Sequence, residues 1–324
     1  EKSCSVRKPC ISPMRNFFCF AILLRTLVCE VNLDQSLNLW AFVTSHDAAT
    51  GYLQGTDAVT AVAKTQRTSL KGQLDCGARA FDLRPAVDTT GQVVMNHGQV
   101  IVPTALATAL QDAKSWAQGH PTELVLIYIS HCYSFVSNIE ISCNNTMFTS
   151  VFSSVGIPLL SDCARVNSLT VRSAMELSTL NGGGHILGVM YCVQENYVAA
   201  QSIGCYVQAQ GKSCYGASAS PDPFTQLAAY LTATSSAASP PSRGLWMLQA
   251  IWQYDDNQVI LSLSAQSSFL LDEQRSGLNL RAAGWAAGYA AVNLFEVNDV
   301  CDAAQALSDM ARARNGQAPL NVTL

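Results

Sequence analysis

The stretch LWAFVTSHD, residues 39–47, shows the pattern on which the fold prediction rests: a short run of strand character leads straight into polar and ionisable residues. Similar apolar runs recur along the chain and alternate with segments of helical pattern. The runs span residues 39–44, 80–83, 93–95, 124–129, 186–191, 245–252 and 290–295. Strands that alternate with helices are typical of βα units. Seven such units predict an α/β fold with a closed or nearly closed parallel barrel.

Two helical patterns support this prediction. The first follows Pro103, with Thr104 as the expected N-cap and Gly119 and Pro121 as the end. Its apolar stripe contains Leu106, Leu110, Ala113 and Ala117. The second, with Leu70 and Leu74 four residues apart, precedes the run at residue 80. Both helices are expected to cover the outside of the sheet.

The composition favours one large domain. The chain has 324 residues, of which 49% are apolar and 13% charged, and its formal net charge is -4. This composition allows one extensive core, and no second domain or internal repeat is evident. The residues from 211 to 243 are rich in Ser, Ala, Gly and Pro and predict loops around one helix. The sequence offers no basic field for a phosphate backbone, so nucleic acid is not an expected partner.

The N-terminal segment resembles a secretory signal. Residues 1–13 are expected to be an upstream or disordered leader, because Met14 is the better start. Residues 14–29 combine a short basic opening with an apolar run too short to span a bilayer, which predicts a signal peptide. A buried N-terminal strand is the alternative. The barrel then occupies residues 30–324, and the protein is expected to be secreted.

Cysteine usage agrees with secretion. Of the twelve cysteines, eight lie beyond residue 30, and no Cys-x-x-Cys spacing is present. Cys205 with Cys214, and Cys132 with Cys143 or Cys163, are local candidates for disulfides, although spacing alone leaves the connectivity open. The sequons at Asn144 and Asn321 fit a glycosylated extracellular protein.

Three apolar runs end in residues suited to phosphodiester cleavage. His46, Arg84 and His97 each follow one of the first three runs, and the carboxyl ends of barrel strands meet at one rim. One histidine can act as base and the other as acid, while an arginine can bind two phosphate oxygens. Singly, each has an ordinary structural explanation: a turn or cap, a core histidine, or an ion pair of Arg84 with Asp82 or Asp88. The joint placement favours a site.

These residues also carry a family resemblance. Residues 44–50, 73–84 and 96–98, together with the helix at 104–118 and the segment 121–124, resemble the X region of phosphatidylinositol-specific phospholipase C. The resemblance covers about 90 residues and is closest to the metal-independent bacterial members. It implies a distorted (β/α)8 TIM-type barrel that cleaves phosphatidylinositol, or a glycosylphosphatidylinositol, to diacylglycerol and a cyclic inositol phosphate.

The resemblance also implies residue roles. His46 matches the general base, His97 the general acid, and Asp47 the carboxylate that supports the acid. Arg84 occupies the position of a metal-binding carboxylate in calcium-using members, which implies that no metal or other cofactor is needed; Ser130, at a further calcium-ligand position, agrees. Glu296 is expected to orient the base, with Asn298 or Asp299 as alternatives.

Head-group recognition departs from the family pattern. Bacterial members place a lysine after the fourth strand and an arginine after the fifth, where this chain has Ser130 with His131, and Tyr191. Asp82, Ser130 and Tyr191 are therefore expected to contact the substrate. His131 and His185 are more simply explained by packing or by neighbouring disulfides, and His120 by a loop.

The expected partners are the lipid substrate and, transiently, a membrane surface; the oligomeric state stays open. Two other functions are compatible with the sequence. One is a metal-dependent glycerophosphodiester or sphingomyelin phosphodiesterase, which the arginine at position 84 disfavours. The other is a secreted head-group-binding barrel without catalytic activity, which the missing basic residues favour.

Overall fold

The computed structural model describes residues 31–195, 244–251, 268–288, 293–320 and 322. Several predicted features lie outside these residues: the leader and signal peptide, the loop-rich stretch 211–243, Cys205, Cys214 and Asn321.

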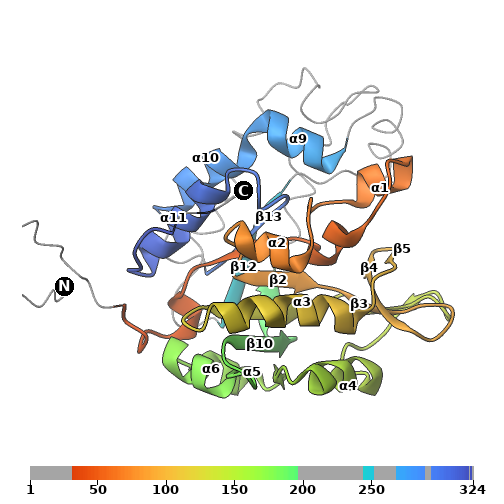
Figure 1. The fold of residues 1–324 in the computed structure, drawn as a ribbon, viewed down its shortest axis with the longest axis horizontal. Coiled ribbons are helices and arrows are strands. Elements are labelled where there is room, and N and C mark those ends of the chain that lie inside the picture. Colours follow the sequence, from red (N-terminus) through yellow and green to blue (C-terminus); the bar gives the residue numbers. More distant parts are fainter. Residues whose placement is uncertain (1–30, 196–243, 252–267, 289–292, 321, 323–324) are drawn as a thin grey trace, which may run out of the picture.

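The larger of two sheets is an eight-stranded, wholly parallel sheet in the order β11-β12-β13-β1-β2-β6-β10-β9 (Figure 1). Its strands are β1 (Phe42–Ser45), β2 (Ala80–Leu83), β6 (Leu124–Ile129), β9 (Leu159–Leu160), β10 (His185–Met190), β11 (Val193–Glu195), β12 (Leu245–Ala250) and β13 (Leu294–Val297). The first barrel strand, β1, lies between β13 and β2. The predicted distorted (β/α) barrel is confirmed, and within the described residues the strand order is open between β9 and β11.

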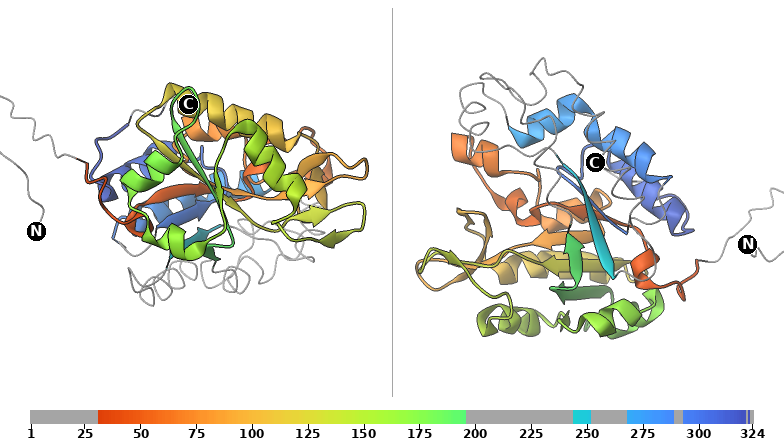
Figure 2. Two further views of the ribbon diagram at one scale, coloured as in Figure 1. Left: turned by 90° about the horizontal axis from the view of Figure 1, so that it is seen from below. Right: turned by 180° about the vertical axis from the view of Figure 1, so that it is seen from behind.

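Helices surround this sheet, as the two further views show (Figure 2). They are α1 (Ala58–Ala63), α2 (Leu70–Asp75), α3 (Leu106–Gly119), α4 (Thr146–Val155), α5 (Cys163–Ser168), α6 (Val171–Leu177), α9 (Phe269–Ser276), α10 (Leu278–Ala286) and α11 (Ala304–Arg314), with short 3-10 helices at Leu37–Leu39 and Ala48–Tyr52. None of the described helices has the length and apolar character needed to cross a membrane.

Alternation along the strands divides the core into an inner and an outer layer. Phe42, Leu294 and Met247 share a register row and pack in the inner cluster. Their neighbours in sequence, such as Val43 and Phe295, belong to the outer cluster between sheet and helices, as the period of two in a strand requires. Two residues beyond Phe42, Leu294 and Met247 on the same strands, Thr44, Glu296 and Gln249 form a buried polar layer. This polar layer lies just below the carboxyl ends of β1 and β13.

The prediction that residues 93–95 form a barrel strand was wrong. The strand β4 (Val93–His97) belongs to a second sheet, ordered β5-β4-β3-β7-β8, and pairs antiparallel with β3 (Pro85–Val87) and β5 (Val100–Val102). Only residues 88–92 separate β3 from β4, and Asp88 Oδ1 accepts hydrogen bonds from the backbone of Thr90 and Gln92 in that turn. A parallel crossover needs a dozen or more residues, so this connection permits only a hairpin.

The predicted helices are present, with one correction at a cap. Leu106, Leu110, Ala113 and Ala117 of α3 are buried, as are Leu70 and Leu74 of α2. The N-cap of α3 is Ala105 rather than Thr104, and no side chain caps this end. Thr104 lies one residue too early to accept from the first-turn amides.

Three disulfides join described residues. Cys132 pairs with Cys143, as one of the two predicted alternatives, whereas Cys163 pairs with Cys192. Cys76, after α2, pairs with Cys301, 225 residues away and just after β13. This bond ties the first barrel helix to the end of the last described barrel strand.

The loop lengths predict which disulfide contributes most to stability. A cross-link restricts the unfolded chain more when it closes a longer loop, by about 5 kcal/mol for the Cys76 pair and about 3 kcal/mol for the Cys132 pair. We expect the double variant Cys76→Ala, Cys301→Ala to lower the free energy of unfolding more than Cys132→Ala, Cys143→Ala does. Urea denaturation of both variants measures the difference, and equal losses would contradict the expectation.

Candidate active site

His46 and Asp47 follow β1 at the carboxyl end of the barrel. The backbone amide of His46 still bonds to the carbonyl oxygen of Val297 on β13, at 3.0 Å. Asp47 then adopts a left-handed backbone conformation, with φ 44°. Outside glycine, aspartate is among the residues that tolerate this region best. Both side chains are buried, so the turn holds an ionisable pair inside the rim of the barrel.

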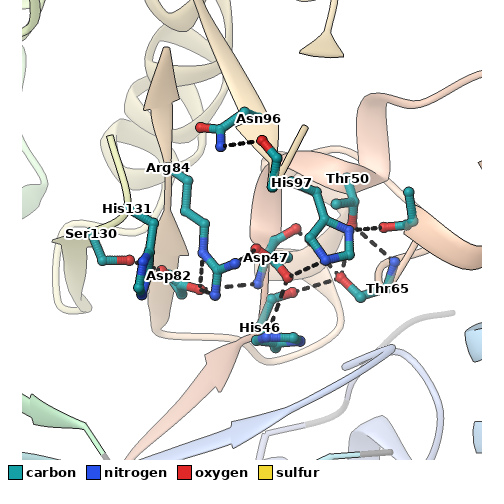
Figure 3. A network of polar contacts seen from close by, with 12 residues as sticks. His46, Asp47, Thr50, Thr65, Asp82, Arg84, Asn96, His97, Ser130 and His131 are labelled. Atoms are coloured by element: carbon teal, nitrogen blue, oxygen red, sulfur yellow. Dashed lines mark hydrogen bonds and ion pairs between the residues drawn. The ribbon is translucent and has the colours of Figure 1, made fainter. Parts of the chain in front are cut away.

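Arg84 forms a fork between two carboxylates, as Figure 3 shows. Its Nη1 lies 2.7 Å from Asp47 Oδ1 and its Nη2 lies 2.8 Å from Asp82 Oδ2. Asp82 comes from β2, and its other oxygen accepts a hydrogen bond from Ser130 Oγ at 2.7 Å. Arg84 is only 8% exposed. A buried guanidinium held by two carboxylates is both neutralised and fixed in orientation.

The two histidines meet at one oxygen of Asp47. His46 Nε2 and His97 Nε2 each lie 3.2 Å from Asp47 Oδ2. His97 belongs to β4 of the second sheet, so Asp47 joins side chains from both sheets (Figure 3). Because Asp47 Oδ1 contacts Arg84, a single carboxylate connects the arginine with both imidazoles.

The second ring nitrogen of each histidine faces an oxygen atom that can only accept a hydrogen bond. His97 Nδ1 lies 2.7 Å from the carbonyl oxygen of Ala63. His46 Nδ1 lies 2.8 Å from Asn298 Oδ1. An Nδ1–H donated to Asn298 fixes the tautomer of a neutral His46 and leaves Nε2 as its proton acceptor.

Burial and neighbouring charges shift the pKa values of His46 and Asp47. Burial lowers the pKa of His46 below its ordinary value of 6.5. The neighbouring Asp47 carboxylate acts in the opposite direction, but its effect is smaller. Burial alone would raise the pKa of Asp47, but Arg84 and the two histidines outweigh it and lower that pKa to about 2. Asp47 is therefore a carboxylate and His46 a neutral base at ordinary pH.

A loop that the sequence did not indicate supports the site from below. Thr65 Oγ1 and Gln66 Nε2 both donate to the carbonyl oxygen of His46, at 2.9 and 3.0 Å. Arg67 binds both oxygens of Asp299, at 2.7 and 2.6 Å. Neither Thr65 nor Gln66 follows an apolar run or carries a charge, so no sequence signal marked them. The loop fixes the backbone of the base histidine to the end of β13.

Asn298, rather than Glu296, supplies the hydrogen bond to the base histidine. Glu296 is buried in the polar layer, in register with Thr44 and one row below the rim. Asn298 lies two residues further along the chain, which was an alternative in the sequence analysis, and the other alternative, Asp299, pairs with Arg67. The sequence placed the orienting residue in the last strand, whereas the structure has it just beyond the strand's end.

The three residues expected to contact the substrate differ in position. Asp82 and Ser130 lie in the network behind Arg84, where Asp82 binds the arginine and Ser130 donates a hydrogen bond to Asp82. Tyr191, directly after β10, is 54% exposed, and its hydroxyl lies 2.9 Å from Ser142 Oγ. The first two therefore hold Arg84 in place, and Tyr191 fastens a rim loop.

The acidic groups of the site raise the question of a metal. His46, Asp47 and Asp82 each bring one potential ligand atom within 4.8 Å of the others. The Arg84 guanidinium, however, already contacts both carboxylates. A divalent cation at the same oxygens would be repelled by this charge. The arrangement as built therefore fits an arginine better than a metal ion.

Comparison with known proteins gives a partial match in sequence. No family model matches the chain. The 1-phosphatidylinositol phosphodiesterase of Staphylococcus aureus strain Newman is 30% identical over 96 residues, which cover 29% of this chain and 30% of that protein. The protein of the same description from strain NCTC 8325 matches over the same length and at the same identity. The aligned segment thus spans less than a third of either relative.

The structural matches extend over almost the whole chain. A crystal structure of a pentafluoro-Phe variant of phosphatidylinositol-specific phospholipase C from S. aureus superposes with a TM-score of 0.60 and 14% identity, covering 90% of this chain and 97% of that one. The enzyme from Listeria monocytogenes gives a TM-score of 0.50 at 12% identity, over 86% and 94% of the two chains. The chain therefore has the fold of the bacterial phosphatidylinositol-specific phospholipases C.

Proposed function

We propose that the chain cleaves the phosphodiester bond of phosphatidylinositol, or of a glycosylphosphatidylinositol, by general acid and base catalysis without a metal ion. One observation carries the proposal: His46 and His97 share one oxygen of Asp47, while the other oxygen binds Arg84. This set provides a base, an acid and a fixed cation within one network. The S. aureus relatives described as 1-phosphatidylinositol phosphodiesterases support this choice of substrate.

In the proposed reaction His46 acts as the base. Its Nε2 takes the proton of the inositol 2-hydroxyl, whose oxygen attacks the phosphorus atom. The new N–H then faces Asp47 Oδ2, 3.2 Å away, so the carboxylate stabilises the charge that forms on the imidazole. Correctly positioned proton transfer of this kind contributes on the order of 10²- to 10⁴-fold in rate.

His97 acts as the acid. Its imidazolium donates a proton to the diacylglycerol oxygen as the bond from phosphorus to that oxygen breaks. The products are diacylglycerol and a cyclic inositol phosphodiester. Arg84 faces the charge that develops on the phosphorane oxygens, and a preorganised donor of this kind lowers the barrier by roughly 3 kcal/mol.

Two other functions make different use of the same residues. A metal-dependent glycerophosphodiester or sphingomyelin phosphodiesterase would need Asp47 and Asp82 as ligands, and both contact Arg84 instead. A head-group-binding barrel without turnover has no need of an acid and a base that share one carboxylate. The catalytic proposal accounts for more of the observed contacts than either alternative.

We also propose that the protein acts outside the cell. Three disulfides among the described residues are typical of an oxidising compartment. Asn144 of the first sequon is exposed and available to a glycan, whereas Asn145 caps α4.

Turnover in the presence of a chelator tests the proposed mechanism. We expect the purified protein to release water-soluble inositol phosphate from phosphatidylinositol vesicles in excess chelator. His46→Ala and Arg84→Ala should each reduce the rate by roughly 10²-fold or more. Arg84→Lys should also be impaired, because an ammonium cannot reproduce the two-carboxylate fork.

Arg172→Ala is the matched control, because Arg172 on α6 forms an exposed ion pair with Asp34 and belongs to no part of the candidate site, so the rate should be unchanged. Release that requires added calcium or magnesium would refute the role of Arg84. Release from a glycosylphosphatidylinositol-anchored protein but not from phosphatidylinositol would reassign the head group.

The shifted pKa of His46 predicts the pH dependence. The base must be neutral, so activity falls as the pH falls through its pKa; because burial lowers this pKa, the acidic limb of kcat/KM should lie below pH 6.5. Asn298→Asp places a carboxylate at Nδ1, which favours the imidazolium and should move this limb upward by about one pH unit. A limb above pH 6.5 in the native protein, or a downward shift in the variant, would contradict the assignment of His46 as the base.

A further inference from the structure

The hairpin formed by β7 (Tyr133–Ser134) and β8 (Ile139–Glu140) carries an apolar tip. Val136 is 66% exposed, the highest value for a large apolar side chain in the described part of the chain, and Ile139 is 55% exposed. Residues 132–139 contain no charged side chain. Scattered apolar side chains on a surface are ordinary, but these two lie three residues apart on one turn and need an explanation.

The hairpin is rigid at its base. The Cys132–Cys143 disulfide closes it, and β7 pairs with β3 through Ala86 and Tyr133. Within the turn, the hydroxyl of Tyr133 donates to Asn138 Oδ1 at 2.9 Å. The tip is thus a preformed element, and little conformational entropy would be lost when it is buried in a partner.

The same sheet is anchored to the candidate active site at its other end. Arg84 directly precedes β3, His97 ends β4, and His131 precedes β7. Because β3 runs parallel to β7 and antiparallel to β4, these three positions share one end of the sheet. The sheet therefore connects the site rigidly to the apolar tip.

We propose that the tip of the β7–β8 hairpin, with Val136 and Ile139, inserts into the surface of the lipid bilayer that holds the substrate. This inference rests on the proposed function, because it names the surface on which that reaction occurs. Val136 lies five positions after His131, a span of at most roughly 17 Å in extended conformation. A tip buried about 5 to 10 Å deep would leave Arg84 and the histidines near the level of the lipid head groups.

A lipid surface fits this tip better than a second protein chain does. Two aliphatic side chains on one turn are far fewer than the 20 to 30 residues that each partner contributes to a stable protein interface. The uncharged tip and the net charge of -4 give no electrostatic attraction to anionic lipids. Apolar insertion is then the source of affinity, and binding should depend little on salt concentration.

The test compares vesicle binding with turnover of a monomeric substrate. The variant Val136→Ser, Ile139→Ser should bind roughly tenfold more weakly than the native protein to phosphatidylcholine vesicles containing phosphatidylinositol, in sedimentation assays. Its rate on short-chain phosphatidylinositol below the micelle concentration should be unchanged, since neither residue belongs to the site. Val136→Trp should strengthen vesicle binding while staying in the supernatant when vesicles are left out, which separates insertion from aggregation. Leu280→Ser, which removes a 61%-exposed apolar side chain on α10, is the matched control and should change neither measurement.

Four outcomes decide the inference. Weaker vesicle binding by the double variant in both 0.1 M and roughly 0.5 M salt supports insertion. Unchanged vesicle binding overturns it. A native dimer that the double variant dissociates, seen by sedimentation velocity, also overturns it, because a second copy then covers the tip. Tip-dependent binding to vesicles without cleavage of either substrate keeps the inference and refutes the proposed function instead.

Discussion

The fork of Arg84 between Asp47 and Asp82 is the interaction on which the site depends. Three charged groups lie in a part of the barrel that water barely reaches, and each would be costly there alone. Together they form a compact network in which the arginine neutralises the carboxylates and the carboxylates set its orientation. Removing one member of a buried ion pair typically costs about 3 to 5 kcal/mol, so each member is fixed by the other two.

The same network separates two chemically identical side chains. Both histidines contact one Asp47 oxygen, and the Nδ1 of each faces an oxygen, the Ala63 carbonyl for His97 and Asn298 Oδ1 for His46. Burial lowers the pKa of His46 and favours its neutral form. The proposed acid and base are thus one residue type in two environments.

Much of this arrangement could be predicted from the sequence, and the limits have physical reasons. His46, Arg84 and His97 were found because each follows a short apolar run, and Asp47 through the family resemblance. The same signal misplaced β4, because a three-residue apolar run reads alike in a barrel and in a hairpin; the short connection at residues 88–92 was the better guide. Asn298 entered only as an alternative to Glu296, and Thr65 and Gln66 act through uncharged side chains that bind a backbone carbonyl, which leave no local pattern. The Cys76–Cys301 bond depends on tertiary closeness that spacing does not encode.

The position of β1 between β2 and β13 has a consequence for how the molecule comes into being. The base histidine is made early in synthesis, but its partner Asn298 lies 252 residues later, so the ribosome delivers the two halves of this contact at very different times. Contacts of such long sequence separation form late in folding. A nascent chain can therefore carry the arginine, the acid and the base and still lack a finished catalytic group. The candidate site is therefore complete only when β13 and the residue that follows it have joined β1.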